Sequence, residues 1–458
     1  MKKYLLFFLM FVLTGIAIQL NAQTTYFVSP NGNDKNKGSE KSPLKSIKAA
    51  QYKARAQKGE VTVYLRGGEY RFSEPLIFTS FDGNKDKHLT LSAYPGENVA
   101  ISGGVALKLQ WQPYKNEIMQ AKVFPKLAID MLTVNGKIRS MARYPNYDST
   151  AVRFNGTSAD ATSPERVKTW KNPAGGFLHA MHVSDWGDFH YRIIGKDEKG
   201  ELKMEGGWQN NRPYSMSKEN RMVENIFEEL DAPGEWFYDT KESVLYYYPV
   251  QNEDIAKSTF EVSLLKHLVE FRGTEQEPVK NITLKNIEFT QTTRTFMEKY
   301  EPLLRSDWTI YRGGAIVFEG TENCVVTGSY LHNLGGNAVF FSNYNRNSGI
   351  SSSHITQVGA SAVCFVGDPN AVRSAVFNYD VYSSYDKIDR QQGPKTNNYP
   401  SECFVRDNLI HTIGLFEKQI TGVELSMSKS ITVSHNSIYD VPRAGINVSE
   451  GTWGGHII

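Results

Sequence analysis

The sequence predicts an all-β fold, a single-stranded parallel β-helix, from three features of the C-terminal half of the chain. Hydrophobic anchors recur there with a 5-3-5 spacing, in the copies Val326-Leu331-Leu334-Val339, Ile350-Ile355-Val358-Val363, Val405-Ile410-Ile413-Val423 and Val433-Ile438-Val441-Ile446. A glycine lies between the third and fourth anchors of each copy, at Gly335, Gly359, Gly414 and Gly445. The anchors are mostly β-branched, which favours strands over helices. A repeat of this length therefore predicts coils of three short strands around a stacked apolar interior.

Polar residues and irregular intervals refine this repeat. Ser329 and Ser353 share one repeat position, as do Asn408 and Asn436, which predicts side-chain ladders between coils. The copy that begins at Val405 has five extra residues before its last anchor. Segment 368–400 precedes that copy, and we expect it to form an extra coil plus a long loop. An earlier coil is expected over residues 281–289.

Residues 23–104 are expected to begin the same β-helix. Ser42 and Pro43 are a plausible N-cap and first residue of a helix over 43–58. Such a helix would cover the open end of the first coil, as repeat folds require. Its buried face and the strands that follow it are expected at Leu44, Ile47, Gln51 and Ala54, and at 61–65, 76–78, 89–91 and 99–101.

The repeat is absent between residues 105 and 255, so we expect an inserted β-rich domain there, with the β-helix resuming over 256–458. This stretch contains five of the seven tryptophans and a hairpin-like run at 244–249. The acidic run 224–239 precedes the hairpin and is expected to be a solvated turn.

Residues 1–22 have the pattern of a secretory signal peptide. Lys2 and Lys3 precede an apolar run that begins at Leu5, and Ala22 offers a small residue for cleavage. The run is shorter than the roughly 20 residues that a membrane span needs. The sequence therefore predicts a periplasmic or secreted protein without a membrane span.

Composition excludes some partners. Lys and Arg number 51 against 49 Asp and Glu, and without Lys2 and Lys3 the charges balance, which argues against a nucleic-acid binder. The three cysteines, Cys324, Cys364 and Cys403, are expected to be buried and not to form a disulfide scaffold. No cofactor is predicted, and the oligomeric state is left open.

Two clusters of aromatic and polar residues, over 175–190 and 206–213, are typical of sugar recognition. A Trp ring can cover the apolar face of a sugar while polar groups meet its hydroxyls. Their alternative role is to pack the inserted domain onto the β-helix. His179, His182 and Asp185 also have a spacing that could hold zinc, although no further ligand is evident and no metal is predicted. The candidate substrate-binding residues here are His182, Trp186, His190, Trp208, Asn210 and Arg212.

A third cluster lies on the predicted β-helix itself. Glu417 falls in the five-residue extension and Glu450 near the last residues, and we take these two as the catalytic carboxylates. Neighbouring coils lie about 4.8 Å apart, so acids one or two coils apart offer the separations that glycoside hydrolysis uses. Arg443 and Trp453 complete the candidate substrate-binding set. Each acid could instead be an ordinary solvated turn residue.

These motifs together resemble glycoside hydrolase family 141. The resemblance rests on 175–190, 206–213, 224–239, Gly393-Pro-Lys-Thr-Asn-Asn398 and the run from Pro442 to Gly455, and it spans nearly all of the chain after residue 22. It implies a right-handed, pectin-lyase-like β-helix with an inserted β-rich domain. It also implies hydrolysis of plant cell-wall glycans, as an α-L-fucosidase or xylanase. Chains of that family continue beyond the Trp453 motif, so we expect an incomplete β-helix with further catalytic acids past Ile458.

Three functions remain open at this point. The first is an exported glycoside hydrolase that uses a carboxylate pair. The second is a polysaccharide lyase on the same fold, in which Lys418 or Arg443 would abstract a proton. The third is a glycan-binding remnant that lacks a complete acid pair. Fold cannot separate them.

Overall fold

The computed structural model describes residues 23–458 except 211, 213, 305–307 and 379. The predicted signal peptide, residues 1–22, lies outside the described residues. Within the described part, no helix combines the length and the apolar character that a membrane crossing requires.

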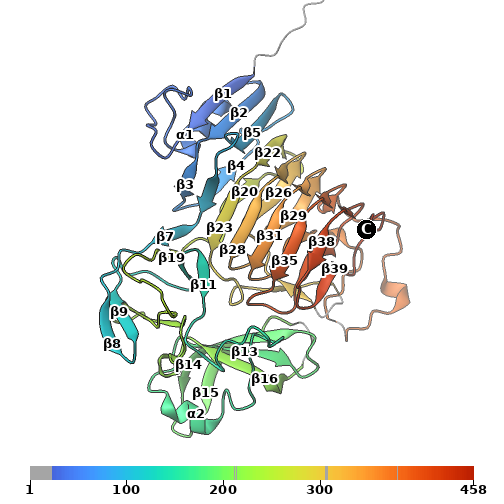
Figure 1. Cartoon of the computed structure of the whole chain (residues 1–458). Helices are drawn as coiled ribbons and strands as arrows, with labels where there is room; N and C mark the ends of the chain where they lie inside the picture. Colours follow the sequence, from blue (N-terminus) through green and yellow to red (C-terminus); the bar gives the residue numbers. More distant parts are fainter. Residues whose placement is uncertain (1–22, 211, 213, 305–307, 379) are drawn as a thin grey trace, which may run out of the picture.

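Three parallel sheets form the main body, and the chain passes from one to the next in repeated turns (Figure 1). The first sheet runs in the order β1 (Thr24–Val28), β2 (Gly59–Leu65), β5 (Lys87–Ala93), β22 (Ile282–Lys285), β27 (Val325–Thr327), β30 (Gly349–Ser351), β34 (Phe404–Arg406) and β37 (Thr432–Ser434). The second runs β3 (Gly68–Arg71), β6 (Val99–Ser102), β23 (Glu288–Thr292), β28 (Tyr330–Leu334), β31 (His354–Val358), β35 (Leu409–Ile413) and β38 (Ser437–Tyr439).

The third sheet runs β4 (Leu76–Phe78), β20 (Val269–Arg272), β26 (Ile316–Glu322), β29 (Val339–Arg346), β32 (Val363–Val366), β36 (Thr421–Ser426) and β39 (Ala444–Val448). Two short strands also pair within it, β21 (Val279–Lys280) with the end of β26 and β33 (Pro400–Ser401) with the end of β29. The all-β composition and the parallel pairing are consistent with a β-helix. From here on, we refer to the three sheets together as the coil, and to one repeat of it as a turn.

The predicted anchors stack in register. In the first sheet Val326 pairs with Ile350, Ile350 with Val405, and Val405 with Val433. At most 3% of each of these four residues is exposed, so the prediction that they point inward is confirmed. The fourth anchors also align across the third sheet, from Val339 through to Ile446.

Two stacks along the coil reinforce this register. A column of rings, with neighbouring centroids 4.4 to 5.2 Å apart, runs through Phe78, Phe271, Phe318, Phe341 and Phe365. The predicted polar ladder is also present. The amide N–H of Ser329 donates to Ser353 Oγ, that of Ser353 to Asn408 Oδ1, and that of Asn408 to Asn436 Oδ1, at 3.0 to 3.1 Å.

The capping helix is present but begins later than predicted. It is α1 (Ile47–Arg55), and its N-cap is Ser46, whose hydroxyl accepts the Ala49 N–H, so the assignment of Ser42 and Pro43 was wrong. Asp34 explains the shift, because it accepts the N–H groups of Lys45 and Ser46 and thereby fixes the chain just before the helix. The predicted apolar face is nonetheless buried.

Segment 368–400 does not form the extra turn of the coil that we expected. β30 pairs directly with β34, β31 with β35, and β32 with β36, so no further turn intervenes. The segment instead forms a loop with two short 3-10 turns, Pro369–Ala371 and Tyr385–Lys387. Most of its residues are exposed, and its apolar residues Val372, Ala375 and Phe377 pack on the cluster outside the third sheet and not in the interior, so the segment lacks the anchors that a turn of the coil would bury.

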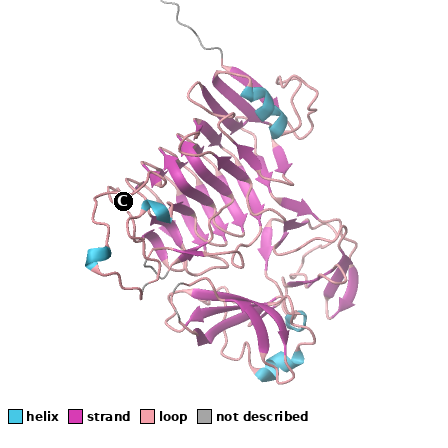
Figure 2. Cartoon of the chain, turned by 180° about the vertical axis from the view of Figure 1, so that it is seen from behind, coloured by secondary structure: helices cyan, strands magenta, loops and turns pink. Residues whose placement is uncertain are grey.

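The stretch without repeats forms three antiparallel sheets beside the coil (Figures 1 and 2). One contains β11 (Lys137–Arg139), β10 (Leu132–Val134), β19 (Phe260–Ser263) and β7 (Gly104–Ala106); another contains β17 (Trp236–Asp239), β18 (Val244–Tyr247), β9 (Ile118–Lys122) and β8 (Gln112–Lys115). The third contains β12 (Arg143–Tyr144), β16 (Met216–Glu224), β13 (Phe177–His182), β14 (Asp188–Lys196) and β15 (Leu202–Gly206), with α2 (Pro164–Thr169) beside it. We call residues 104–263 the inserted region; β19 carries it beyond residue 255.

Candidate active site

The five extra residues of the third repeat copy meet the inserted region. They fall between β35 and β36 and carry Glu417, Lys418 and Gln419, all buried. The backbone N–H of Lys418 donates to Asp188 Oδ2 at 2.6 Å, and that of Gln419 to Asp188 Oδ1 at 3.3 Å. Asp188 opens β14, so one carboxylate of the inserted region holds this loop of the coil.

Glu417 is the acid of this loop, and its pKa is strongly shifted. Only 6% of it is exposed. Burial, with a further contribution from the negative charge of Asp188, raises the pKa of Glu417 to about 8, although hydrogen bonds from Tyr300 and Thr295 oppose the shift. A carboxyl group that keeps its proton near neutral pH suits general acid catalysis.

A second carboxylate, Glu424, lines the same small cavity as Glu417. Glu424 lies on β36 between the inward-facing Val423 and Leu425, and so faces away from the interior of the coil. Its oxygens accept hydrogen bonds from Asn447 Nδ2 at 2.8 Å and Ser449 Oγ at 2.7 Å. The cavity has a volume of about 10 Å³, room for roughly one water. A sugar ring could enter it only if its rim opened.

Aromatic side chains surround this position. Trp308 and Tyr311 line the cavity itself. The guanidinium of Arg443 lies 4.6 Å from the ring centroid of Trp308 and 5.2 Å from that of Trp186, and so bridges the coil and the inserted region. Arg212 lies 5.4 Å from the Trp186 ring. Such cation–π contacts can orient the rings that a sugar would meet.

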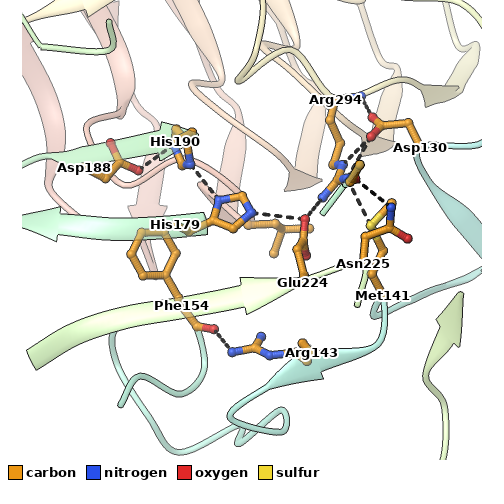
Figure 3. Close-up of polar contacts among 12 residues, drawn as sticks. Asp130, Met141, Arg143, Phe154, His179, Asp188, His190, Glu224, Asn225 and Arg294 are labelled. Carbon is orange, nitrogen blue, oxygen red and sulfur yellow. Dashed lines mark hydrogen bonds and ion pairs between the residues drawn. The ribbon is translucent and has the colours of Figure 1, made fainter. Parts of the chain in front are cut away.

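A buried chain of titratable groups continues from Asp188 through the inserted region (Figure 3). His190 Nε2 lies 3.1 Å from Asp188 Oδ2, and His190 Nδ1 lies 2.6 Å from Nδ1 of His179. His179 Nε2 lies 3.1 Å from Glu224 Oε1, which also accepts a hydrogen bond from Arg294. Arg294 finally pairs with Asp130 at 2.7 Å, which links the inserted region to the coil a second time.

The protons of this chain can be assigned from its partners. Burial lowers the pKa of His179 to about 4, so its ring is neutral at pH 7. Burial alone would raise the pKa of Glu224, but the charge of Arg294 and the hydrogen bonds from Arg294 and His179 hold it far below its usual range, so Glu224 is ionised. A neutral His179 that donates from Nε2 to Glu224 must accept at Nδ1. His190 therefore donates from Nδ1 in this arrangement.

The structure brings some predicted substrate-binding residues together near Glu417 but buries others. His182 and His190 are fully buried, so neither ring is available to a ligand at the surface. His182 packs against Trp186 at 3.6 Å and against Tyr214 at 5.7 Å between centroids. Trp208 is 40% exposed, and its Nε1 donates to the backbone carbonyl of Glu298 at 2.8 Å.

The other predicted residues lie at the edges of this area. Asn210 accepts the N–H of Arg212 at 2.9 Å within their loop. The Trp453 ring packs on Tyr399 at 4.4 Å and on the apolar cluster outside the third sheet. Glu450 is exposed and does not line the cavity of Glu417 and Glu424.

The zinc spacing of His179, His182 and Asp185 does not converge. Asp185 pairs with Arg153 at 3.1 Å and accepts from Asn220, whereas the two histidines join different clusters. No group of three or more His, Cys, Asp or Glu in the described residues could hold a metal ion.

The expectation of a solvated acidic turn over 224–239 was wrong for three residues. Glu224, Glu229 and Glu235 are each at most 6% exposed. Glu229 accepts the Trp170 Nε1–H at 2.7 Å, and burial raises the pKa of Glu235 to about 8. Tertiary partners far along the chain bury these acids, which their local sequence does not reveal.

The sequence analysis did not include several residues that the structure places in this site. The one with a local signal is Glu424, a charge in the middle of an otherwise buried strand. The others become neighbours only through the fold, and they are Asp130, Asp188, Glu224, Arg294, Tyr300 and Trp308.

Comparisons with known proteins place the fold. The chain is similar to a solved structure described as a glycoside hydrolase, with a TM-score of 0.75 and 18% identity, over 93% of this chain and 80% of that one. It is also similar to the structure of XylC with xylose, with a TM-score of 0.52 and 13% identity, over 94% of this chain and 61% of that one.

At the level of sequence, no protein-family model matches the chain. A curated relative, the uncharacterized protein YwoF of Bacillus subtilis (strain 168), is 32% identical over 108 residues. That match covers 24% of this chain and only 21% of the relative's length.

Proposed function

We propose that this protein is a glycoside hydrolase, with Glu417 as the general acid. The observation that carries the proposal is the cavity shared by two buried carboxyl residues, Glu417 and Glu424, one of which holds its proton near neutral pH. Glycoside hydrolysis needs a protonated acid to assist the leaving group and a second carboxyl group as base or nucleophile.

Glu424 is our first choice for that second group, and Glu450 is the alternative. Glu424 shares the cavity with Glu417 and is held by Asn447 and Ser449, which fixes its orientation. Glu450 is exposed, and it would have to approach the site when a ligand binds. The two roles are separable by mutation.

The substrate that we propose is a plant cell-wall glycan, bound where the inserted region meets the coil. The exposed ring of Trp208 and the ring of Trp186 would cover sugar faces, and the guanidinium groups of Arg212 and Arg443 lie near the Trp186 ring. The fold shared with a glycoside hydrolase and with XylC supports a right-handed, pectin-lyase-like β-helix and a glycan-active enzyme. Residues 1–22 would export the protein.

The test is hydrolysis of a panel of xylan- and fucose-containing oligosaccharides by the full chain and three variants. Glu417→Gln should lower kcat by about 10²–10⁴-fold, as expected for loss of a general acid. Glu424→Gln should do the same, while Glu450→Gln should have little effect. The matched control is Glu60→Gln, because Glu60 is an exposed acid on β2 far from the cavity.

Each outcome decides between named alternatives. Loss of activity in Glu450→Gln with an active Glu424→Gln would move the second role to Glu450. Unsaturated, ultraviolet-absorbing products would indicate a lyase. The lyase hypothesis has less support, because Lys418 Nζ is buried and donates to the carbonyls of Gly414 at 2.6 Å and Leu415 at 3.2 Å. Binding without turnover would indicate a glycan-binding protein and overturn the proposal.

A further inference from the structure

We propose that Asp188 is a positioning residue of the active centre, through which the inserted region holds the Glu417 loop in its working geometry. This inference rests on the proposed function, and it adds that the inserted region is part of the catalytic machinery as well as a surface for substrate. It concerns a residue that touches the Glu417 loop and not the substrate.

The first argument is the hydrogen bonding of the loop. The two oxygens of Asp188 accept the consecutive backbone N–H groups of Lys418 and Gln419, the residues that directly follow Glu417. Both residues are buried, so without Asp188 these donors would lose partners that water could not easily replace. The loop exists because this copy of the repeat is five residues longer than its neighbours, and it lies outside the β-sheet pairing. The backbone N–H groups of Phe416 and Glu417 donate to the Gly359 carbonyl, so the loop is held from the coil up to Glu417 and by Asp188 directly after it.

The second argument is that Asp188 is itself held in place. His190 stands 3.1 Å from its carboxylate, and the backbone N–H of His190 donates to Gln209 Oε1 at 3.1 Å. Gln209 in turn donates to the backbone carbonyl of Phe296 in the coil at 2.7 Å. Because Asp188 is only 2% exposed, it has no freedom to turn toward solvent. A buried carboxylate that is held between such groups transmits position accurately.

The third argument is electrostatic. The negative charge of Asp188 acts on Glu417 and favours its protonated form, in the same direction as burial. Asp188 itself stays ionised, because His190 and the Lys418 backbone outweigh the effect of burial on its pKa. Other groups that face this pair or its supports, and that any pH experiment must consider, are Lys418, Tyr300, Arg143, His179, Glu224 and Arg294.

The test compares Asp188→Asn with Thr133→Val in the full chain. Asparagine keeps the shape of the side chain but removes its charge and one acceptor. Thr133→Val is the matched control, because it removes a buried hydrogen bond between the inserted region and the coil, from Gln291 Nε2 to Thr133 Oγ1 at 2.8 Å, away from Glu417. The readouts are the pH profile of kcat/KM and the infrared carbonyl band of protonated Glu417, identified by its loss in Glu417→Gln.

For Asp188→Asn we expect the pKa of Glu417, and with it the alkaline limb of the profile, to fall by about one unit. Thr133→Val should leave both at their wild-type positions. Loss of activity with an unmoved alkaline limb and infrared titration would reduce Asp188 to a purely structural role and overturn the inference. Because the infrared titration needs no substrate, it still decides the inference if no glycan is hydrolysed and the proposed function fails.

If Asp188→Asn fails to fold, His190→Gln offers a second variant, because it weakens the support of Asp188 while leaving the carboxylate in place. A lowered alkaline limb in His190→Gln would support positioning. So would an alkaline limb of Asp188→Glu that lies between that of His190→Gln and that of the wild type. Wild-type pH behaviour in His190→Gln together with full activity would show that Asp188 needs no support from the buried chain and would contradict the second argument.

Discussion

The indole Nε1 of Trp208, in the inserted region, donates a hydrogen bond to the backbone carbonyl of Glu298 in the segment that follows β23 of the coil, at 2.8 Å. The same side chain is 40% exposed. A half-exposed tryptophan that is anchored at its polar edge presents its ring to solvent in a fixed orientation. This is the geometry that stacking on a sugar requires.

Trp208→Ala should therefore weaken glycan binding with little loss of stability. The lost hydrogen bond costs about 1 kcal/mol of unfolding free energy. The binding is measured by calorimetric titration of the best wild-type substrate into the Glu417→Gln protein, which binds without turnover, with and without Trp208→Ala. The control is Trp170→Ala, in which a fully buried ring is lost at a cost of about 3–5 kcal/mol. A large loss of stability in Trp208→Ala with unchanged affinity would show that Trp208 only packs the inserted region.

Phe341→Ala should destabilise the coil by about 3–5 kcal/mol, because it opens a cavity in the middle of the phenylalanine column. Phe341→Leu should cost less, since it fills most of the space. Urea unfolding followed by tryptophan fluorescence measures both. Equal stability of the Ala variant and the wild type would contradict a close-packed column.

Asn408→Ala should cost about 2 kcal/mol, because it breaks the polar ladder at its centre. Asn408 is 3% exposed, and its amide oxygen accepts the Ser353 N–H while its Nδ2 donates to Asn436 Oδ1. Ser434→Ala, on β37 and outside the ladder, is the comparison and should be nearly neutral. Similar costs for the two variants in chemical denaturation would argue against the ladder as a stabilising element.

Stability should fall as the pH is lowered from about 6.5. The folded pKa of His179 lies near 4 and that of Glu224 lies below its usual range, so the unfolded chain binds protons that the folded chain refuses. The stability that depends on His179 is present above pH 6.5 and is lost as the pH falls toward 4. The loss linked to Glu224 follows below about pH 4.5. Unfolding free energies at a series of pH values should show a flatter acid limb in His179→Gln.

The Glu417→Gln variant should gain stability relative to the wild type as the pH rises. A carboxyl whose pKa is raised to about 8 contributes fully below its unfolded value near 4.5, and this contribution is lost as the pH rises toward 8. Glutamine does not titrate, so the difference in unfolding free energy should move in favour of the variant between pH 5 and pH 8. A difference that stays constant over this interval would show that Glu417 is not perturbed.

Much of the coil was predictable because its stability depends on a repeated local pattern. The spacing of Val326, Ile350, Val405 and Val433 gave their register and their inward orientation. It could not tell that segment 368–400 leaves the coil without adding a turn, since loops carry no periodic burial. The helix start also moved from Pro43 to Ile47, because Asp34, a residue outside the helix, fixes the chain there.

By itself, the sequence determined the periodic core, the polar ladders and the place of the inserted region, and it singled out Glu417 as a candidate. The tertiary structure alone decided which groups surround Glu417. Asp188 and Lys418 are 230 residues apart in the chain yet share a hydrogen bond, and Glu224, Glu229 and Glu235 are buried although their local sequence is polar. The physical reason is that a repeat reports which side chains face inward, whereas a pKa and a hydrogen-bond partner depend on every group that packing brings near.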